Sequence, residues 1–156
     1  MQKALKVLIL GIGNPGRGDD GLGPALIERL QQNSQMRSDL LNAERVCEFR
    51  YQLNVEDALT IKDYDAVVFT DATTAGDSPA TLTKIGPADT IAFTTHRMSP
   101  ASVLALCHEL YGRAPKAAML AIRGYDWDIG ERLSPQAEKN LDRAINLLDE
   151  FMNDLG

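Results

Sequence analysis

Three side chains that could share one metal ion follow three separate predicted strands of this chain. Asp20 lies in the loop after the first strand, Asp71 directly follows a buried apolar strand, and His96 follows a weaker strand. Carboxylate oxygen and imidazole nitrogen are ligands that suit nickel, zinc, iron or manganese. Three protein ligands leave coordination positions open, as catalytic and substrate-sensing metal sites require. The three residues therefore predict a site for metal-assisted chemistry.

Each of these residues also has a structural alternative. An aspartate near the start of a helix often caps it, and an aspartate after a strand often shapes a turn. A single histidine is often structural, and for His108, in a predicted helix beside Cys107, we expect a packing role. The chain contains only two cysteines, so it can form neither a disulfide scaffold nor a four-cysteine zinc site. Any metal or acid–base chemistry must therefore depend on carboxylates.

Length and charge restrict the class of protein. The chain has 156 residues, which at roughly 100–200 residues per domain predicts one domain over 1–156. Its net charge of −6 argues against nucleic acid or an anionic membrane as the main partner, because both attract basic surfaces. No segment approaches the roughly 18 apolar residues of a membrane helix, and the apolar run at 7–10 is too short for a signal peptide. We therefore expect a cytoplasmic protein with free thiols.

Predicted strands and helices alternate along the chain. Six segments are predicted to be strands, the fourth and fifth of them weaker: 6–12, 44–50, 66–70, 80–85, 91–94 and 116–123. Capping residues and helical spacing predict helices that begin near Pro24, Asn54, Ser99 and Ser134. The third of these helices should end at Gly112 and bury Val103, Leu106 and Leu110. The alternation predicts an α/β fold of the phosphorylase/hydrolase-like type, a three-layer sandwich with a mostly parallel central sheet of about five strands flanked by helices.

The predicted sheet brings the candidate ligands together. The strands at 6–12 and 66–70 are expected to be neighbours whose connections leave to opposite faces, and ligands bind at such a switch point, at the carboxyl ends of the strands. Asp20, Asp71 and His96 should converge at that edge. In the loop that carries Asp20, we expect Gly13, Asn14 and Asp19 to support the site by shaping the loop.

Two other functions that the first loop suggests are rejected. Its Gly-x-Gly-x-x-Gly over 11–16 is typical of dinucleotide binding, but that motif must run straight into a helix whose free amides hold the pyrophosphate. Here Pro15 removes one amide, and Asp19 and Asp20 would repel phosphate. The Gly-Ile-Gly-Asn-Pro-Gly sequence also looks like the opening of the peptidyl-tRNA hydrolases. A catalytic histidine soon follows it in that family, whereas no histidine precedes His96 here.

Four segments in the right order resemble the NiFe-hydrogenase maturation endopeptidases. They are 11–14 with 19–23, 67–72, 95–100, and 122–125 through 130–135. The resemblance covers essentially the whole chain. It implies an α/β fold and a protease that removes a C-terminal extension from the large-subunit precursor of a NiFe hydrogenase after nickel insertion. Carried over by motif, Asp20, Asp71 and His96 would be the metal-binding and catalytic residues, which engage the nickel held by the precursor.

The resemblance also implies the partner and the cofactor. Nickel would be presented by the substrate, no tightly held cofactor is expected, and other divalent ions could occupy the same ligands. Many members carry a Gly-Gly-rich segment after the second strand, thought to help select the substrate. Here that place contains Tyr51 and Gln52, which are therefore candidate substrate contacts, and it looks more like the branch that serves bidirectional, NAD-linked hydrogenases. Alternatively Tyr51 packs on a neighbour. We expect a monomer whose partner is the hydrogenase precursor, with no nucleic acid and no membrane.

The mechanism has two forms that the sequence leaves open. The metal could polarise the scissile carbonyl or lower the pKa of a bound water. Alternatively, an aspartate could act as general base on water while nickel only reports that the precursor is ready. A different class of function also remains, a non-enzymatic nickel chaperone or adaptor that docks on the precursor without hydrolysis.

Overall fold

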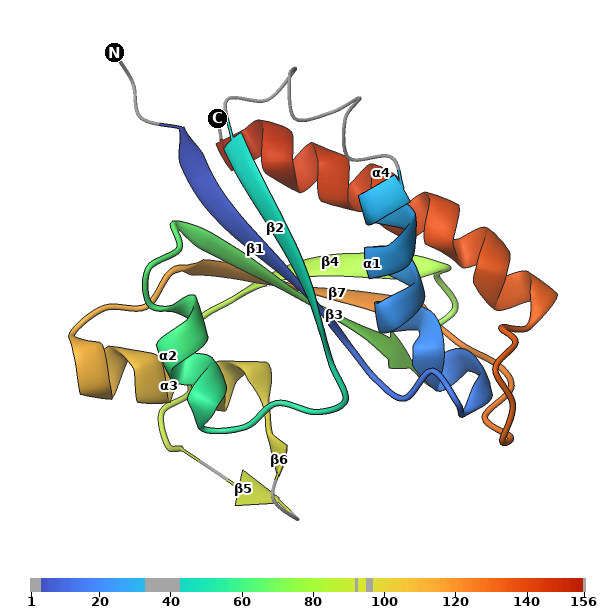
Figure 1. Ribbon diagram of the computed structural model, residues 1–156, viewed down its shortest axis with the longest axis horizontal. Coiled ribbons are helices and arrows are strands. Elements are labelled where there is room, and N and C mark those ends of the chain that lie inside the picture. Colours follow the sequence, from blue (N-terminus) through green and yellow to red (C-terminus); the bar gives the residue numbers. More distant parts are fainter. Residues whose placement is uncertain (1–3, 33–42, 92, 95–96, 156) are drawn as a thin grey trace.

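The computed structural model describes residues 4–32, 43–91, 93–94 and 97–155. Figure 1 labels its elements, which follow in the order β1 (Leu5–Ile12), η1 (Gly18–Gly21), α1 (Leu22–Gln32), β2 (Ala43–Arg50), α2 (Glu56–Ile61), β3 (Ala66–Thr73), β4 (Ala80–Ile85), β5 (Phe93–Thr94), β6 (Arg97–Met98), α3 (Pro100–Tyr111), β7 (Lys116–Arg123) and α4 (Pro135–Leu155). None of the described helices is long and apolar enough to cross a membrane.

Five strands form a mostly parallel sheet in the order β2-β1-β3-β7-β4. The strand β1 pairs in parallel with β2 on one side and with β3 on the other, and β3 pairs in parallel with β7. Only β4, at an edge, runs antiparallel to its neighbour β7. The predicted α/β class and the mostly parallel sheet of about five strands are therefore confirmed.

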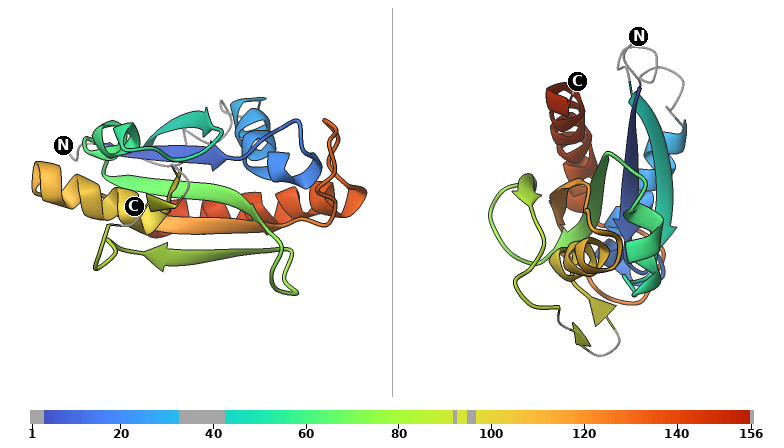
Figure 2. Two further views of the ribbon diagram at one scale, coloured as in Figure 1. Left: turned by 90° about the horizontal axis from the view of Figure 1, so that it is seen from below. Right: turned by 90° about the vertical axis from the view of Figure 1, so that its left-hand side faces the viewer.

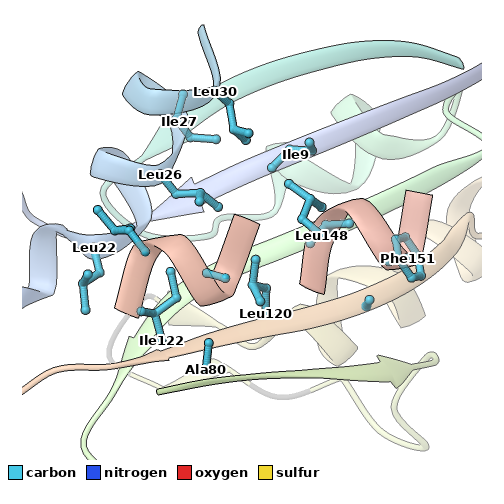
Figure 3. Close-up of a cluster of buried hydrophobic side chains, with 14 of the residues drawn as sticks. Ile9, Leu22, Leu26, Ile27, Leu30, Ala80, Leu120, Ile122, Leu148 and Phe151 are labelled. Carbon is cyan, nitrogen blue, oxygen red and sulfur yellow. The ribbon is translucent and has the colours of Figure 1, made fainter. Parts of the chain in front are cut away.

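Helices cover both faces of this sheet (Figure 2). On one face, α1 and α4 bury Leu26 and Leu148 against strand residues such as Ile9 (Figure 3). On the other face, α2 and α3 bury Ile61 and Leu104 against the remaining side of the strands. Because β1 and β3 lose both faces to helices, their sequences are continuous apolar runs instead of alternating ones.

The fifth predicted strand is only partly correct. Of the segment 91–94, the structure assigns Phe93–Thr94 to a strand, β5, which pairs with β6 in a separate two-stranded sheet. The amide N–H of Met98 donates to the carbonyl of Leu53 at 3.2 Å. This short hairpin is therefore attached to the turn after β2 and not to the central sheet.

The buried face of α3 differs from the predicted one. Val103, Leu104 and Cys107 are buried, whereas Leu110 is 59% exposed. At about 100° per residue, the buried stripe is centred between positions 103 and 104, about 70° away from Leu110. The expectation of a packing role for His108 is wrong for the same reason, because its side chain is exposed.

The start of α2 also differs from the prediction. Asn54 was expected to cap this helix, but the N-cap position is Val55 and no side chain accepts a bond there. Instead the backbone N–H of Asn54 donates to Oδ2 of the buried Asp57, in the first helical turn, at 2.8 Å. An acidic side chain in the first turn can satisfy this amide and is favoured by the helix dipole.

Candidate functional site

The carboxyl ends of β1 and β3 form the switch point that the sequence predicts. These strands are neighbours, with Gly11 opposite Thr70 at the end of their shared register. The chain leaves β1 through η1 and α1 on one face of the sheet, whereas α2, which precedes β3, lies on the other face. Asp20 lies in η1, and Asp71 lies within β3 instead of just after it.

The structure brings Asp20 and Asp71 to one pocket of about 230 Å³ at this edge. Its lining residues come from the ends of β1, β2 and β3, from η1, and from the segment that leads into α3: Ile12, Gly13, Asp20, Tyr51, Gln52, Leu53, Asp71, Arg97, Met98, Ser99 and Pro100. Two carboxylates and the positively charged side chain of Arg97 therefore line the same pocket.

The loop after β1 holds the Asp20 carboxylate in place. The backbone N–H of Asn14 donates to Asp20 Oδ2 at 2.9 Å, and Asn14 Oδ1 accepts from the N–H of Gly16 at 2.8 Å. Gly13 has a φ of +142°, and a Cβ there would lie 2.0 Å from the carbonyl oxygen of Asp20. Only glycine can fill this position without moving the backbone that carries Asp20.

This loop also differs in shape from a dinucleotide-binding loop. The turn η1 lies between the glycines at 11–16 and α1, so the glycines do not run straight into the helix. Both Asp19 and Asp20 lie in that intervening turn.

The environment of Asp71 raises the pKa of its carboxyl group toward neutral pH. The pKa of Asp71 is raised to about 6, chiefly by burial and also by the negative charge of Asp20. The N–H of Ala72, which donates to Asp71 Oδ1 at 2.8 Å, and the positive charge of Arg97 act in the opposite direction. Asp71 is thus a carboxylate that can both bind a cation and exchange a proton near neutral pH.

The third expected ligand, His96, lies outside the described residues. Within the described part of the chain, no group of three histidine, cysteine, aspartate or glutamate side chains is placed to hold a metal ion. Asp20 and Asp71 could supply two oxygen ligands, and all three metal ligands remain predictions from the sequence.

Arg97 is a pocket residue that the sequence analysis did not single out. It is exposed, lies two residues before the α3 cap Ser99, and attracts Asp71 electrostatically. Its position next to His96 in the sequence was the available signal, because the sequence predicts that His96 belongs to the site.

The candidate substrate contacts Tyr51 and Gln52 both line the pocket. Tyr51 is 65% exposed, and its ring meets Phe49 edge to face with centroids 5.0 Å apart. An ion pair between Arg50 Nε and Asp57 Oδ1, 2.9 Å long, fixes the base of this turn. The tyrosine therefore both contacts a neighbour and presents an accessible face at the rim.

Comparisons with known proteins identify the fold. No protein-family model matches the chain, and no curated protein matches it. Among solved structures, it is similar to the hydrogenase maturating endopeptidase HybD from E. coli, with a TM-score of 0.73 and 17% identity over 97% of this chain and 94% of that one. It is also similar to the NiFe-hydrogenase maturation protease HycI from Thermococcus kodakarensis, with a TM-score of 0.66 and 23% identity over 95% and 92%. A third similar structure is a hydrogenase 2 maturation peptidase from a Thaumarchaeota archaeon. Its TM-score is 0.65, with 18% identity over 94% of this chain and 97% of that one. The chain thus has the fold of the hydrogenase maturation endopeptidases.

Proposed function

We propose that this protein is an endopeptidase that removes the C-terminal extension of a NiFe-hydrogenase large-subunit precursor after nickel has been inserted. The observation that carries the proposal is the pair of carboxylates, Asp20 and Asp71, in one pocket at the strand switch point of a maturation-endopeptidase fold. The similar structures are named as hydrogenase maturation endopeptidases, proteases or peptidases, and the four sequence segments that resemble the family include both carboxylates. The partner is therefore a protein, recognised through its metal.

In this proposal, Asp20 and Asp71 bind the nickel that the precursor presents, and His96 completes the ligand set. The pocket offers oxygen ligands held by the backbone, through the amides of Asn14 and Ala72. Such ligands suit a divalent cation, so zinc, iron or manganese could occupy the same positions. The chain acts as a monomer in the cytoplasm, on the precursor of a hydrogenase that belongs, in our proposal, to the bidirectional NAD-linked type.

The properties of Asp71 favour a proton-transfer role in the hydrolysis. A general base works best when its pKa lies near the operating pH, and burial brings the pKa of Asp71 to about 6. In this form of the mechanism, Asp71 would act as a general base in place of a nickel ligand and take the proton of the attacking water, while nickel would report that the precursor is ready. Tyr51 and Gln52 at the rim would contact the precursor chain.

The dependence on nickel is tested with two forms of the precursor. The purified protein is incubated with nickel-loaded and with nickel-free precursor, and the chain length of the product is followed. We expect shortening only with the loaded form. Equal shortening of both forms would refute recognition through nickel, and tight binding without any shortening would identify a nickel adaptor instead of a protease.

The raised pKa of Asp71 predicts that processing slows as the medium becomes acidic. With a pKa of about 6, the ionised fraction falls from about nine-tenths at pH 7 to about one-tenth at pH 5. Since a general base must be ionised to take a proton, the rate should fall roughly tenfold over this range. A pH–rate profile measured on nickel-loaded precursor checks this. A rate that stays level down to pH 4.5 would exclude Asp71 as the titrating group.

A further inference from the structure

Asp19 is a buried charge that neither the metal contact nor the proton transfer uses. Its side chain is fully buried, at 0% exposure. The carboxylate accepts four hydrogen bonds, all from the segment between β7 and α4: Tyr125 N at 2.7 Å, Asp126 N at 2.9 Å, Ser134 N at 2.7 Å and Ser134 Oγ at 2.7 Å. Burying a carboxylate is costly unless its oxygens are satisfied, and four short bonds from one segment satisfy them. These bonds therefore join two parts of the chain that lie far apart in sequence.

The backbone reinforces the same junction. Gly18 N–H donates to the carbonyl of Gly130 at 2.8 Å, and Gly130 N–H donates to the carbonyl of Gly16 at 2.9 Å. The amide of Asp19 donates to the carbonyl of Asp126 at 2.7 Å. We call this set of contacts between residues 16–19 and 124–134 the loop junction.

The two segments approach so closely that side chains are excluded between them. A Cβ on Gly18, which has a φ of +55°, would lie 2.5 Å from the carbonyl oxygen of Asp126. A Cβ on Gly124 would lie 2.8 Å from the Cβ of Asp19. The loop junction is thus tightly packed, and it leaves no empty space into which an altered Asp19 side chain could move.

Asp19 and Asp20 are consecutive residues of one short turn, and their carboxylates accept hydrogen bonds from different parts of the chain. Asp19 bonds to the segment beyond β7, whereas Asp20 lines the pocket and accepts the N–H of Asn14. A single 3₁₀ turn makes few bonds of its own, so its orientation depends on its contacts with other parts of the chain.

We propose that Asp19 is a positioning residue whose buried carboxylate fixes the turn η1 through the loop junction and thereby aims the Asp20 carboxylate into the pocket. The catalytic consequence rests on the proposed function, since it concerns Asp20 as an acting group. The placement of Asp20 itself does not depend on which reaction the pocket performs.

The test compares Asp19→Asn with a variant that is destabilised elsewhere. Leu148→Ala removes a fully buried side chain of α4 and serves as this control. Amide hydrogen exchange is measured at Asn14, whose N–H bonds to Asp20, and at Tyr125 and Asp126. In Asp19→Asn we expect exchange at all three amides to accelerate by about tenfold or more, relative to the global unfolding of each variant, and in Leu148→Ala we expect no such local acceleration.

The kinetic readout separates positioning from stability. For nickel-loaded precursor, Asp19→Asn should lower kcat by about tenfold or more, because the displaced Asp20 carboxylate no longer has the productive geometry, whereas the rim contacts are untouched. Leu148→Ala should keep kcat near that of the parent protein at a temperature where it is folded. Unchanged exchange at Asn14 in Asp19→Asn, or a kcat equal to that of Leu148→Ala, would overturn the proposal.

A second pair of variants decides the question if Asp19→Asn does not fold. Ser134→Ala deletes one of the four donors to Asp19, and Ser134→Thr retains the hydroxyl. We expect faster exchange at Asn14 in Ser134→Ala and its restoration in Ser134→Thr, and the absence of this difference would contradict the proposal. If the parent protein fails to cleave the precursor, the proposed function is refuted. Hydrogen exchange needs no substrate, so the exchange data would still test the role of Asp19.

Discussion

Replacing Asp71 by asparagine should lower the rate of precursor processing by about 10²- to 10⁴-fold, the range associated with loss of a general acid–base group. Asparagine retains the size of aspartate and an oxygen that can accept the N–H of Ala72, but it carries no charge and cannot take a proton. The rate is measured under single-turnover conditions with nickel-loaded precursor. Asp20→Asn should be similarly defective, because it removes the other carboxylate of the pocket.

The Asp71→Asn substitution should not destabilise the fold. Burial and the neighbouring Asp20 raise the pKa of Asp71, so holding this group ionised at neutral pH costs the folded state free energy. Its neutral replacement should therefore leave the free energy of unfolding at pH 7 unchanged or higher. The matched control is Asp77→Asn, at an exposed position in the loop after β3, which should process the precursor normally. Normal processing by both Asp71→Asn and Asp20→Asn would show that the site is wrongly assigned.

Gly23→Ala should strongly destabilise the framework of the site. Alanine is normally a better helix residue than glycine, by about 1 kcal/mol. At this position, however, the added Cβ would lie 2.4 Å from the carbonyl oxygen of Ile12 and 2.8 Å from that of Thr70. Because both obstacles are backbone atoms of central strands, α1 would have to move away from β1 and β3. We expect the free energy of unfolding to fall by about 3 kcal/mol or more, at or beyond the usual upper end of overpacking costs.

Urea unfolding of Gly23→Ala and Gly86→Ala measures this effect. Gly86 has nothing within 4 Å of an added Cβ and no positive φ that favours glycine, so its substitution should be neutral or stabilising by up to about 1 kcal/mol. Since η1 directly precedes α1, a displaced helix would also move Asp20. If Gly23→Ala were as stable as Gly86→Ala, the close contact between α1 and the ends of β1 and β3 would be incorrect.

The sequence predicted the elements that depend on local pattern. The strand at 116–123 was predicted with the same bounds as β7, and the helix that begins after Ser99 is capped by that side chain and closed by Gly112 in the left-handed conformation, as expected. Buried parallel strands consist of continuous apolar residues, and capping residues act on their own helix. Such signals need no knowledge of distant partners. Parallel pairing of β1 and β3 then places Asp20 and Asp71 at one edge.

Features that depend on distant contacts could not be predicted. The donors to Asp19 lie 106 to 115 residues further along the chain, so the sequence suggested only a supporting role in the loop. Arg97 became a pocket residue only because its hairpin attaches to the turn after β2. The errors at Leu110 and His108 arose because several apolar stripes fit the sequence of α3, and packing against the sheet selects one of them.

The central claim, that this protein hydrolyses one peptide bond of a nickel-loaded hydrogenase precursor, is tested most directly by intact-mass spectrometry of the reaction in water enriched in ¹⁸O. Hydrolysis at a single bond should give two fragments whose masses together equal that of the precursor plus one water. One labelled oxygen should appear in the new C-terminal carboxylate of the large fragment. With Asp71→Asn, the precursor should remain essentially uncleaved in the time that the parent protein needs to complete the reaction. A precursor of unchanged mass, held in a stable complex with this protein, would contradict the account and identify a binding protein in place of a protease.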